Sequence, residues 1–247
     1  MKALPTLELL WTVTVILASF AVGLSSVEHL QLFSHGRRER LSAVLASFRF
    51  LLVVGIFLYW VGGGSLLTQS IGGAFLGIVF LSYALSILWG GAFHGGSDAM
   101  VILTWSALSL GSIFQWHEGA LAGLAVQLSA SYFVAGVWKW RGSPEWRSGE
   151  AFERILGNSR YVSAPHRALM TRVPVSLWRM ATRGVILWEV SFPLAWLGPS
   201  STVLYLGAGF LFHLFNAWAL GLNRFLWAWF ALYPALLFWV GKLHTSG

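Results

Sequence analysis

The chain has 247 residues, of which 57% are hydrophobic and only 10% are charged. An ordinary soluble domain is about one-quarter charged, so this composition argues against a water-soluble domain and favours a protein that spans a membrane. The formal charge of +7 does not indicate a nucleic-acid-binding protein, because the basic residues lie beside apolar segments, where anionic lipid headgroups are the expected contact. The absence of cysteine excludes thiol chemistry and Cys-ligated metal sites.

The apolar segments are long enough to cross a bilayer, whose core takes about 20 residues of helix. We predict an all-α, polytopic transmembrane helix bundle of about eight spans. The first span is expected to be a retained helix rather than a cleaved signal segment, since no small-residue cleavage site follows it. The spans lie near Leu7–Leu24, Ala43–Gly63, Ile71–Gly91, Ala99–Phe114, Gly119–Trp138, Gly184–Leu197, Ser201–Leu222 and Phe225–Val240.

The connections predict the organisation of the chain. Residues 1–39 form an N-terminal span with a basic loop, and residues 40–247 form the helix bundle. The longest connection, residues 139–183, is a polar loop with nine basic and three acidic residues. Apolar residues alternate with arginines from Val173 to Arg183, which is typical of an interfacial amphipathic helix; a solvated basic loop is the alternative. Because the basic loops fall on one side of such a bundle, the positive-inside rule places both termini outside the cytoplasm.

Two ionisable residues inside predicted spans indicate a partner or a function, because an isolated charge is costly there. Arg49, in the second span, can hold an anionic substrate or a carboxylate, or its long side chain can reach back to the headgroups. Glu189, in the sixth span, is expected to be protonated or to face a cation such as Arg49. A structural ion pair and a catalytic acid both fit Glu189.

His94 and Asp98 are four residues apart, with two glycines between them. A histidine beside a carboxylate can act as an oriented base. The alternative for this segment is structural, because Ser97 or Asp98 can cap the helix that follows.

His213 and Asn216 share a face of the seventh predicted helix, where they either hydrogen-bond to another helix or line a cavity. His117 and Glu118 are expected to lie solvated in a loop. A metal site remains only a minor alternative, since the spacing of the histidines and carboxylates matches no metal-binding motif.

Lys139 lies between Trp138 and Trp140 at the expected end of a span. A lysine partly desolvated among aromatic rings can act as a neutral amine base or nucleophile. The alternative is an ordinary anchor at the membrane interface.

Several segments, taken in order, resemble the HTTM (horizontally transferred transmembrane) family, the membrane domain shared by vitamin K-dependent γ-carboxylase and many bacterial proteins. The resemblance extends from about Arg40 to Val240. It rests on Phe48–Leu52 with Arg49, Gly95–Asp98 with Trp105, Tyr132–Lys139, Trp146-x-x-Gly149, Glu189 with Pro193, and His213 followed by Gly221–Phe225.

The resemblance implies that Lys139 deprotonates a hydroquinone cofactor, because a lysine before the Trp-x-x-Gly element does so in the carboxylase. We therefore expect a membrane-embedded, carboxylase-like enzyme that modifies or matures a secreted peptide or uses a lipid-soluble quinone. Its expected cofactor is a quinone or hydroquinone. Its expected catalytic residues are Lys139, His94 and Asp98. Its expected cofactor-binding residues are Arg49, Glu189, His213, Asn216 and Trp146.

The resemblance also implies partners. The shorter bacterial relatives, such as the membrane component of sporulation-delaying toxin maturation, look like partners in maturing a secreted peptide or toxin and usually need a second protein. We accordingly expect the lipid bilayer, a second protein encoded nearby and a secreted peptide as partners, and the bacterial inner membrane as location. The alternatives are a non-catalytic partner subunit for peptide maturation or export, and a small-molecule transporter.

Overall fold

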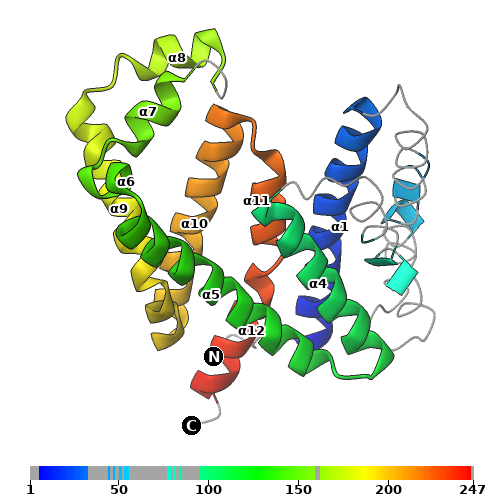
Figure 1. Ribbon diagram of the computed structural model, residues 1–247. Coiled ribbons are helices and arrows are strands. Elements are labelled where there is room, and N and C mark those ends of the chain that lie inside the picture. Colours follow the sequence, from blue (N-terminus) through cyan, green and yellow to red (C-terminus); the bar gives the residue numbers. More distant parts are fainter. Residues whose placement is uncertain are drawn as a thin grey trace. The chain divides into compact units, whose positions relative to one another are not determined.

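The computed structural model describes residues 6–32, 44, 47, 50, 51, 53–55, 77, 78, 80, 81, 84, 95–158 and 162–245. Every regular element in this part of the chain is a helix (Figure 1), which confirms the all-α class there. The chain forms two compact units. The first unit comprises residues 1–126 and 224–247, and the second comprises residues 127–223.

The first unit contains α1 (Leu7–Leu32), α4 (Gly96–Ile113), the start of α5 (His117–Gly142), α11 (Asn223–Phe230) and α12 (Tyr233–Thr245). Helix α1 packs against α4 and α12. A Cβ at Gly111 would lie 2.7 Å from the Cβ of Ala120 and 2.9 Å from the ring of Trp11. A residue without a side chain is therefore needed at this position in the last turn of α4.

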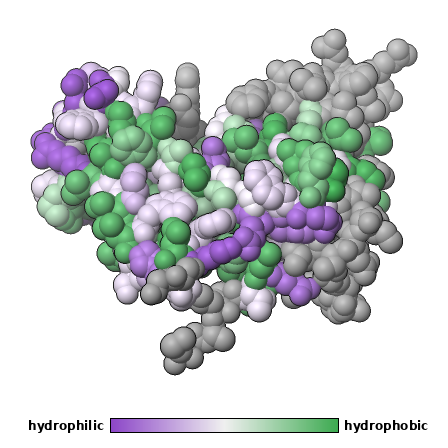
Figure 2. Space-filling model, turned by 90° about the horizontal axis from the view of Figure 1, so that it is seen from below, coloured by the Kyte–Doolittle hydropathy of each residue, from purple (hydrophilic) through white to green (hydrophobic). Residues whose placement is uncertain are grey.

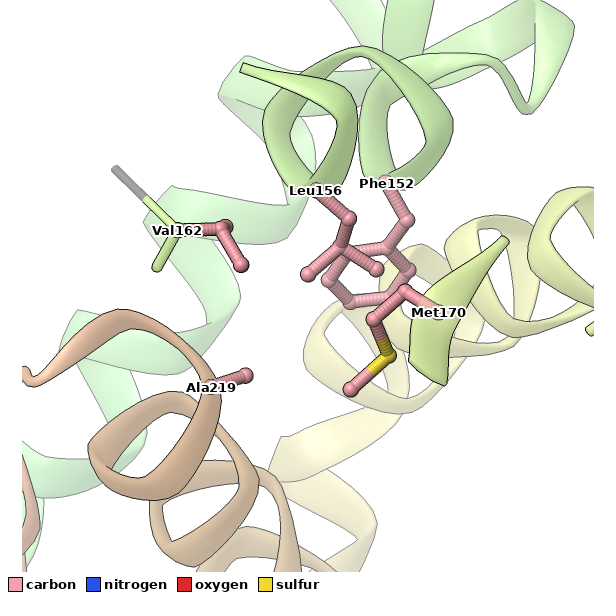
Figure 3. Packing of buried hydrophobic residues seen from close by; sticks show 5 residues of the cluster. All are labelled: Phe152, Leu156, Val162, Met170 and Ala219. Carbon is pink, nitrogen blue, oxygen red and sulfur yellow. The ribbon is translucent and has the colours of Figure 1, made fainter. Parts of the chain in front are cut away.

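The second unit contains the rest of α5 and six further helices in its described residues. These are α6 (Pro144–Ser148), α7 (Ala151–Gly157), α8 (Ala164–Met170), α9 (Val175–Ser191), the 3-10 helix η1 (Phe192–Leu197) and α10 (Pro199–Leu220). Proline opens α6 and α10, and glycine in the left-handed conformation ends them at Gly149 and Gly221, the common arrangement at helix ends. Figure 3 shows Phe152, Leu156 and Met170 from the short helices gathered beside Ala219 of α10.

Among the described residues, four helical segments are long and apolar enough to cross a membrane: Leu7–Leu24, His117–Gly142, Pro199–Leu220 and Asn223–Thr245. They correspond to the first, fifth, seventh and eighth predicted spans, and α4 covers the fourth as a helix of 18 residues. The predicted spans at 43–63 and 71–91 lie largely outside the described residues, so the count of eight stays a prediction.

The predicted sixth span, Gly184–Leu197, is divided between two elements. Helix α9 ends at Ser191, and η1 carries the chain to Leu197. Pro193 accounts for the change, because proline has no N–H for an α-helical hydrogen bond and its ring clashes with the carbonyl four residues before it.

The predicted polar loop at 139–183 is largely helical where the structure describes it. Helix α5 continues to Gly142, three short helices follow, and α9 begins at Val175. The amphipathic helix predicted near Val173 is therefore the first half of α9, which continues without a break to Glu189.

The surface of the described residues is rich in apolar side chains. Leu187, Leu204 and Trp138 are 71%, 70% and 67% exposed. Figure 2 shows broad apolar areas on the face that it presents, with hydrophilic groups between them. Large apolar side chains exposed in this way are expected on helices whose solvent is lipid.

Candidate functional site

One face of α5 in the second unit carries the residues around which the candidate site is built. Tyr132, Gly136 and Lys139 follow one another at intervals of four and three residues, so they share a helical face. A Cβ at Gly136 would lie 2.7 Å from the Cβ of Glu189 and 2.8 Å from the backbone nitrogen of Val190. The missing side chain therefore lets α9 approach α5 next to Lys139.

This approach pairs Lys139 with Glu189. The Nζ of Lys139 donates a hydrogen bond to Oε1 of Glu189. The lysine side chain is 18% exposed and the glutamate side chain 3% exposed. The second carboxylate oxygen, Oε2, is buried and has no hydrogen-bond partner among the described residues. The lysine side chain is thus partly accessible to an incoming group, and Oε2 of Glu189 is a buried acceptor without a donor among the described residues.

Two aromatic rings cover the amine. Its Nζ lies 4.8 Å from the ring centroid of Trp146 and 5.8 Å from that of Phe212. These distances fall within the range of cation–π interaction. Trp146 belongs to α6, Phe212 to α10 and Glu189 to α9. Three elements besides α5 therefore surround the amine.

The Trp-x-x-Gly element positions Trp146. Gly149 has a φ of +88°, and a Cβ there would lie 3.0 Å from the Cβ of Arg179 on α9. The guanidinium of Arg183 also donates a 3.1 Å hydrogen bond to the carbonyl of Ser148. Glycine is needed at this position both for the left-handed turn and for the close contact, and this holds α6 against α9.

A second polar pair lies on the same face of α5. The hydroxyl of Tyr132 is 2.9 Å from Nε2 of His213, and both residues are 3% exposed. The Tyr132 ring packs against Phe192 and Trp188, with centroids 4.4 Å and 4.7 Å away. Sequence reasoning assigned no role to Tyr132, although its interval of seven residues from Lys139 places it on the same face.

Replacing Tyr132 with phenylalanine is expected to lower the free energy of unfolding by about 1–3 kcal/mol, because it leaves a buried imidazole nitrogen without its partner. Thermal unfolding in detergent micelles would measure the loss. Phe133→Leu, on the exposed side of the same helix, is the control and is expected to change stability by less than about 0.5 kcal/mol. Equal stability of Tyr132→Phe and the parent protein would contradict the assignment.

No family model matches the chain, and neither a curated protein nor a solved structure matches it. The interpretation of the site therefore rests on its own residues. Of the predicted site residues, the second unit brings together Lys139, Glu189, Trp146 and His213. Asn216 lies one turn beyond His213 and is half-buried. Its backbone carbonyl accepts a hydrogen bond from the backbone N–H of Leu222.

Asp98 lies in the first unit, where Arg224 is one partner of its carboxylate. The Nη1 of Arg224 donates to its Oδ1 at 3.2 Å, and the carboxylate is buried. The predicted capping role of Ser97 or Asp98 is wrong, because Gly95 is the N-cap of α4 and no side chain caps the helix. Gly95 has a φ of +112°, which a side chain would disfavour. His94 and Arg49 lie outside the described residues.

His117 and Glu118 are not a solvated loop, which corrects the sequence-based expectation. They begin α5. His117 is 7% exposed and meets the ring of Trp11 edge-on, with centroids 4.6 Å apart. Lys242 of α12 donates to Oε2 of Glu118. Among the described residues, no group of three histidines and carboxylates is placed to hold a metal ion.

Proposed function

We propose that the protein is a membrane-embedded enzyme in which Lys139 acts as a general base, of the carboxylase-like type that the HTTM resemblance implies. The observation that carries this proposal is the pairing of a partly enclosed amine with a buried carboxylate, under the rings of Trp146 and Phe212. A proton held between an amine and a carboxylate can pass to the carboxylate, which leaves a neutral amine able to accept a proton from a substrate.

The proposed step is a proton transfer. A hydroxyl of a lipid-soluble hydroquinone gives its proton to the neutral Nζ of Lys139, which yields a phenolate and an ammonium. Glu189 keeps the proton that it took from Lys139, and its carbonyl oxygen accepts a hydrogen bond from the new ammonium. The aromatic walls exclude water, which strengthens the attraction between the ammonium and the phenolate. The hydrogen bond between His213 of α10 and Tyr132 lies along the same face of α5 as Lys139.

The experiment uses the purified full-length protein in micelles with a reduced isoprenoid quinone and oxygen. Mass spectrometry follows the loss of the reduced quinone. Lys139→Ala is expected to lower the rate about 10²–10⁴-fold, the usual contribution of a general base. Lys242→Ala is the matched control, because Lys242 also pairs with a glutamate and also lies near aromatic rings. It is expected to retain the full rate.

Two results would contradict the proposal. One is a folded Lys139→Ala variant that retains the parent rate. The other is an absence of conversion by the parent protein, both alone and with the product of a neighbouring gene. The second result would favour a non-catalytic membrane subunit for peptide maturation, in which the Lys139–Glu189 pair only joins α5 to α9.

A further inference from the structure

Helix α9 changes character along its length. Its first half carries Arg179 and Arg183, whereas from Gly184 to Ser191 its one ionisable residue is Glu189, which faces Lys139. Its outer face is apolar: Met180 and Leu187, seven residues apart, are 67% and 71% exposed. A helix with arginines in its first half only and exposed apolar side chains in both halves is suited to pass from the headgroup region into the hydrocarbon region.

Several arginines next to the N-terminal half of α9 have no acidic partner in the part of the chain that the structure describes. Arg154 bridges two carboxylates, those of Glu145 and Glu150. By contrast, no described carboxylate pairs with four exposed arginines, which we name the arginine surface: Arg147, Arg172, Arg179 and Arg183. Arg183 bonds only to the backbone carbonyl of Ser148, so its charge remains uncompensated.

The arginine surface stands on a packed scaffold. Phe152 and Met170 lie in one apolar cluster with Ala219 of α10 (Figure 3). The indole N–H of Trp178 donates to the carbonyl of Met170 at 3.3 Å, which fixes the turn that carries Arg172. A backbone that is already ordered loses little freedom when the arginines bind, which lowers the entropic cost of binding.

We infer that the arginine surface binds the phosphate groups of anionic phospholipids. Guanidinium groups bind phosphate through paired hydrogen bonds. Leu177 and Met180, exposed beside Arg179, supply the apolar contact with acyl chains that a free phosphate or a nucleic acid could not use. Trp138 and Trp140 at the end of α5 are also exposed, as is common at the membrane interface. This inference does not depend on the chemistry of Lys139.

The test compares two single-charge variants of the full-length protein in an uncharged detergent. Short-chain phosphatidylglycerol is titrated in, with phosphatidylcholine of the same chain length as reference, and the rise in melting temperature gives an apparent affinity. Arg179→Ala is expected to weaken phosphatidylglycerol binding about fivefold at low salt. Arg154→Ala removes the same charge but leaves binding unchanged, because Arg154 is already neutralised by its carboxylates. Arg179→Ala keeps the Cβ that contacts Gly149, so α6 stays in place.

Arg154 is a dependable control because its partner, Glu145, stays ionised. The pKa of Glu145 is lowered, chiefly by a hydrogen bond from its own backbone N–H and also by the hydroxyl of Ser143. A carboxyl group with a lowered pKa stays ionised from neutral pH down to mild acid. Arg154 therefore stays paired throughout the titration.

Each outcome is decisive. The inference is supported if Arg179→Ala lowers the affinity for phosphatidylglycerol about fivefold and Arg154→Ala leaves it unchanged. It also requires a larger loss of affinity in the triple variant Arg147→Ala, Arg172→Ala, Arg179→Ala, and weaker binding at about 0.5 M salt. Equal loss for both single variants would show only a net-charge effect and overturn it. An equal rise in melting temperature with phosphatidylcholine, or with inorganic phosphate alone, would also overturn it.

Discussion

Replacing Lys139 with methionine is expected to lower the free energy of unfolding by about 3–5 kcal/mol. Methionine keeps most of the apolar stem but leaves the carboxylate of Glu189, which is only 3% exposed, without its cation. An unpaired buried charge is the costly state; the pair itself adds little compared with apolar residues of the same size. Chemical unfolding in micelles, followed by tryptophan fluorescence, would measure the loss.

The double variant Lys139→Met, Glu189→Leu separates the two interpretations of this pair. Because it removes both charges, it is expected to recover most of the lost stability. If the pair only joins α5 to α9, function returns with stability; if Lys139 is the base, the folded double variant stays inactive. Lys242→Met is the control, since the side chains of Lys242 and Glu118 are 42% and 46% exposed. Its cost should lie at about 0–1 kcal/mol, and a cost equal to that of Lys139→Met would contradict the prediction.

The helices could be predicted from the sequence because apolar composition and length are local properties. The failures come from features that depend on other parts of the chain. His117 looked solvated because its neighbours are polar, yet Trp11 on α1 buries it. The sixth span looked continuous by hydropathy, although Pro193 changes the type of helix within it.

The candidate site was partly predictable for the same reason. Lys139, Glu189 and His213 were each recognisable as polar residues within apolar sequence. Their pairing was not, because it depends on the contact between α5 and α9, which follows from the missing side chain at Gly136. The sequence suggested Arg49 as an example of a cation for Glu189, and the structure shows Lys139 in that role. Tyr132 escaped notice because a tyrosine in an aromatic-rich helix has no distinguishing local pattern.

Substitution of Gly136 is therefore expected to damage the site from a position that makes no polar contact with it. In Gly136→Ala, the new methyl group would lie 2.7 Å from the Cβ of Glu189 and 2.8 Å from the nitrogen of Val190. Both are parts of α9 that cannot rotate away, so the helix must shift. Overpacking of this kind costs about 1–3 kcal/mol, against a gain of up to about 1 kcal/mol from the better helix propensity of alanine. Gly136→Val adds two further methyl groups and a β-branched side chain, so its loss should be larger.

Gly123→Ala is the matched control, because Gly123 lies in the same helix and a Cβ there would meet no atom within 4 Å. It is expected to stabilise the protein slightly or leave it unchanged, whereas Gly136→Ala destabilises it. Moving α9 away from α5 also separates Glu189 from Lys139, so Gly136→Ala should reduce the effect of a subsequent Lys139→Met substitution. A double-mutant cycle measures this coupling. Additive effects of the two substitutions would show that the contact at Gly136 does not bring Glu189 to Lys139.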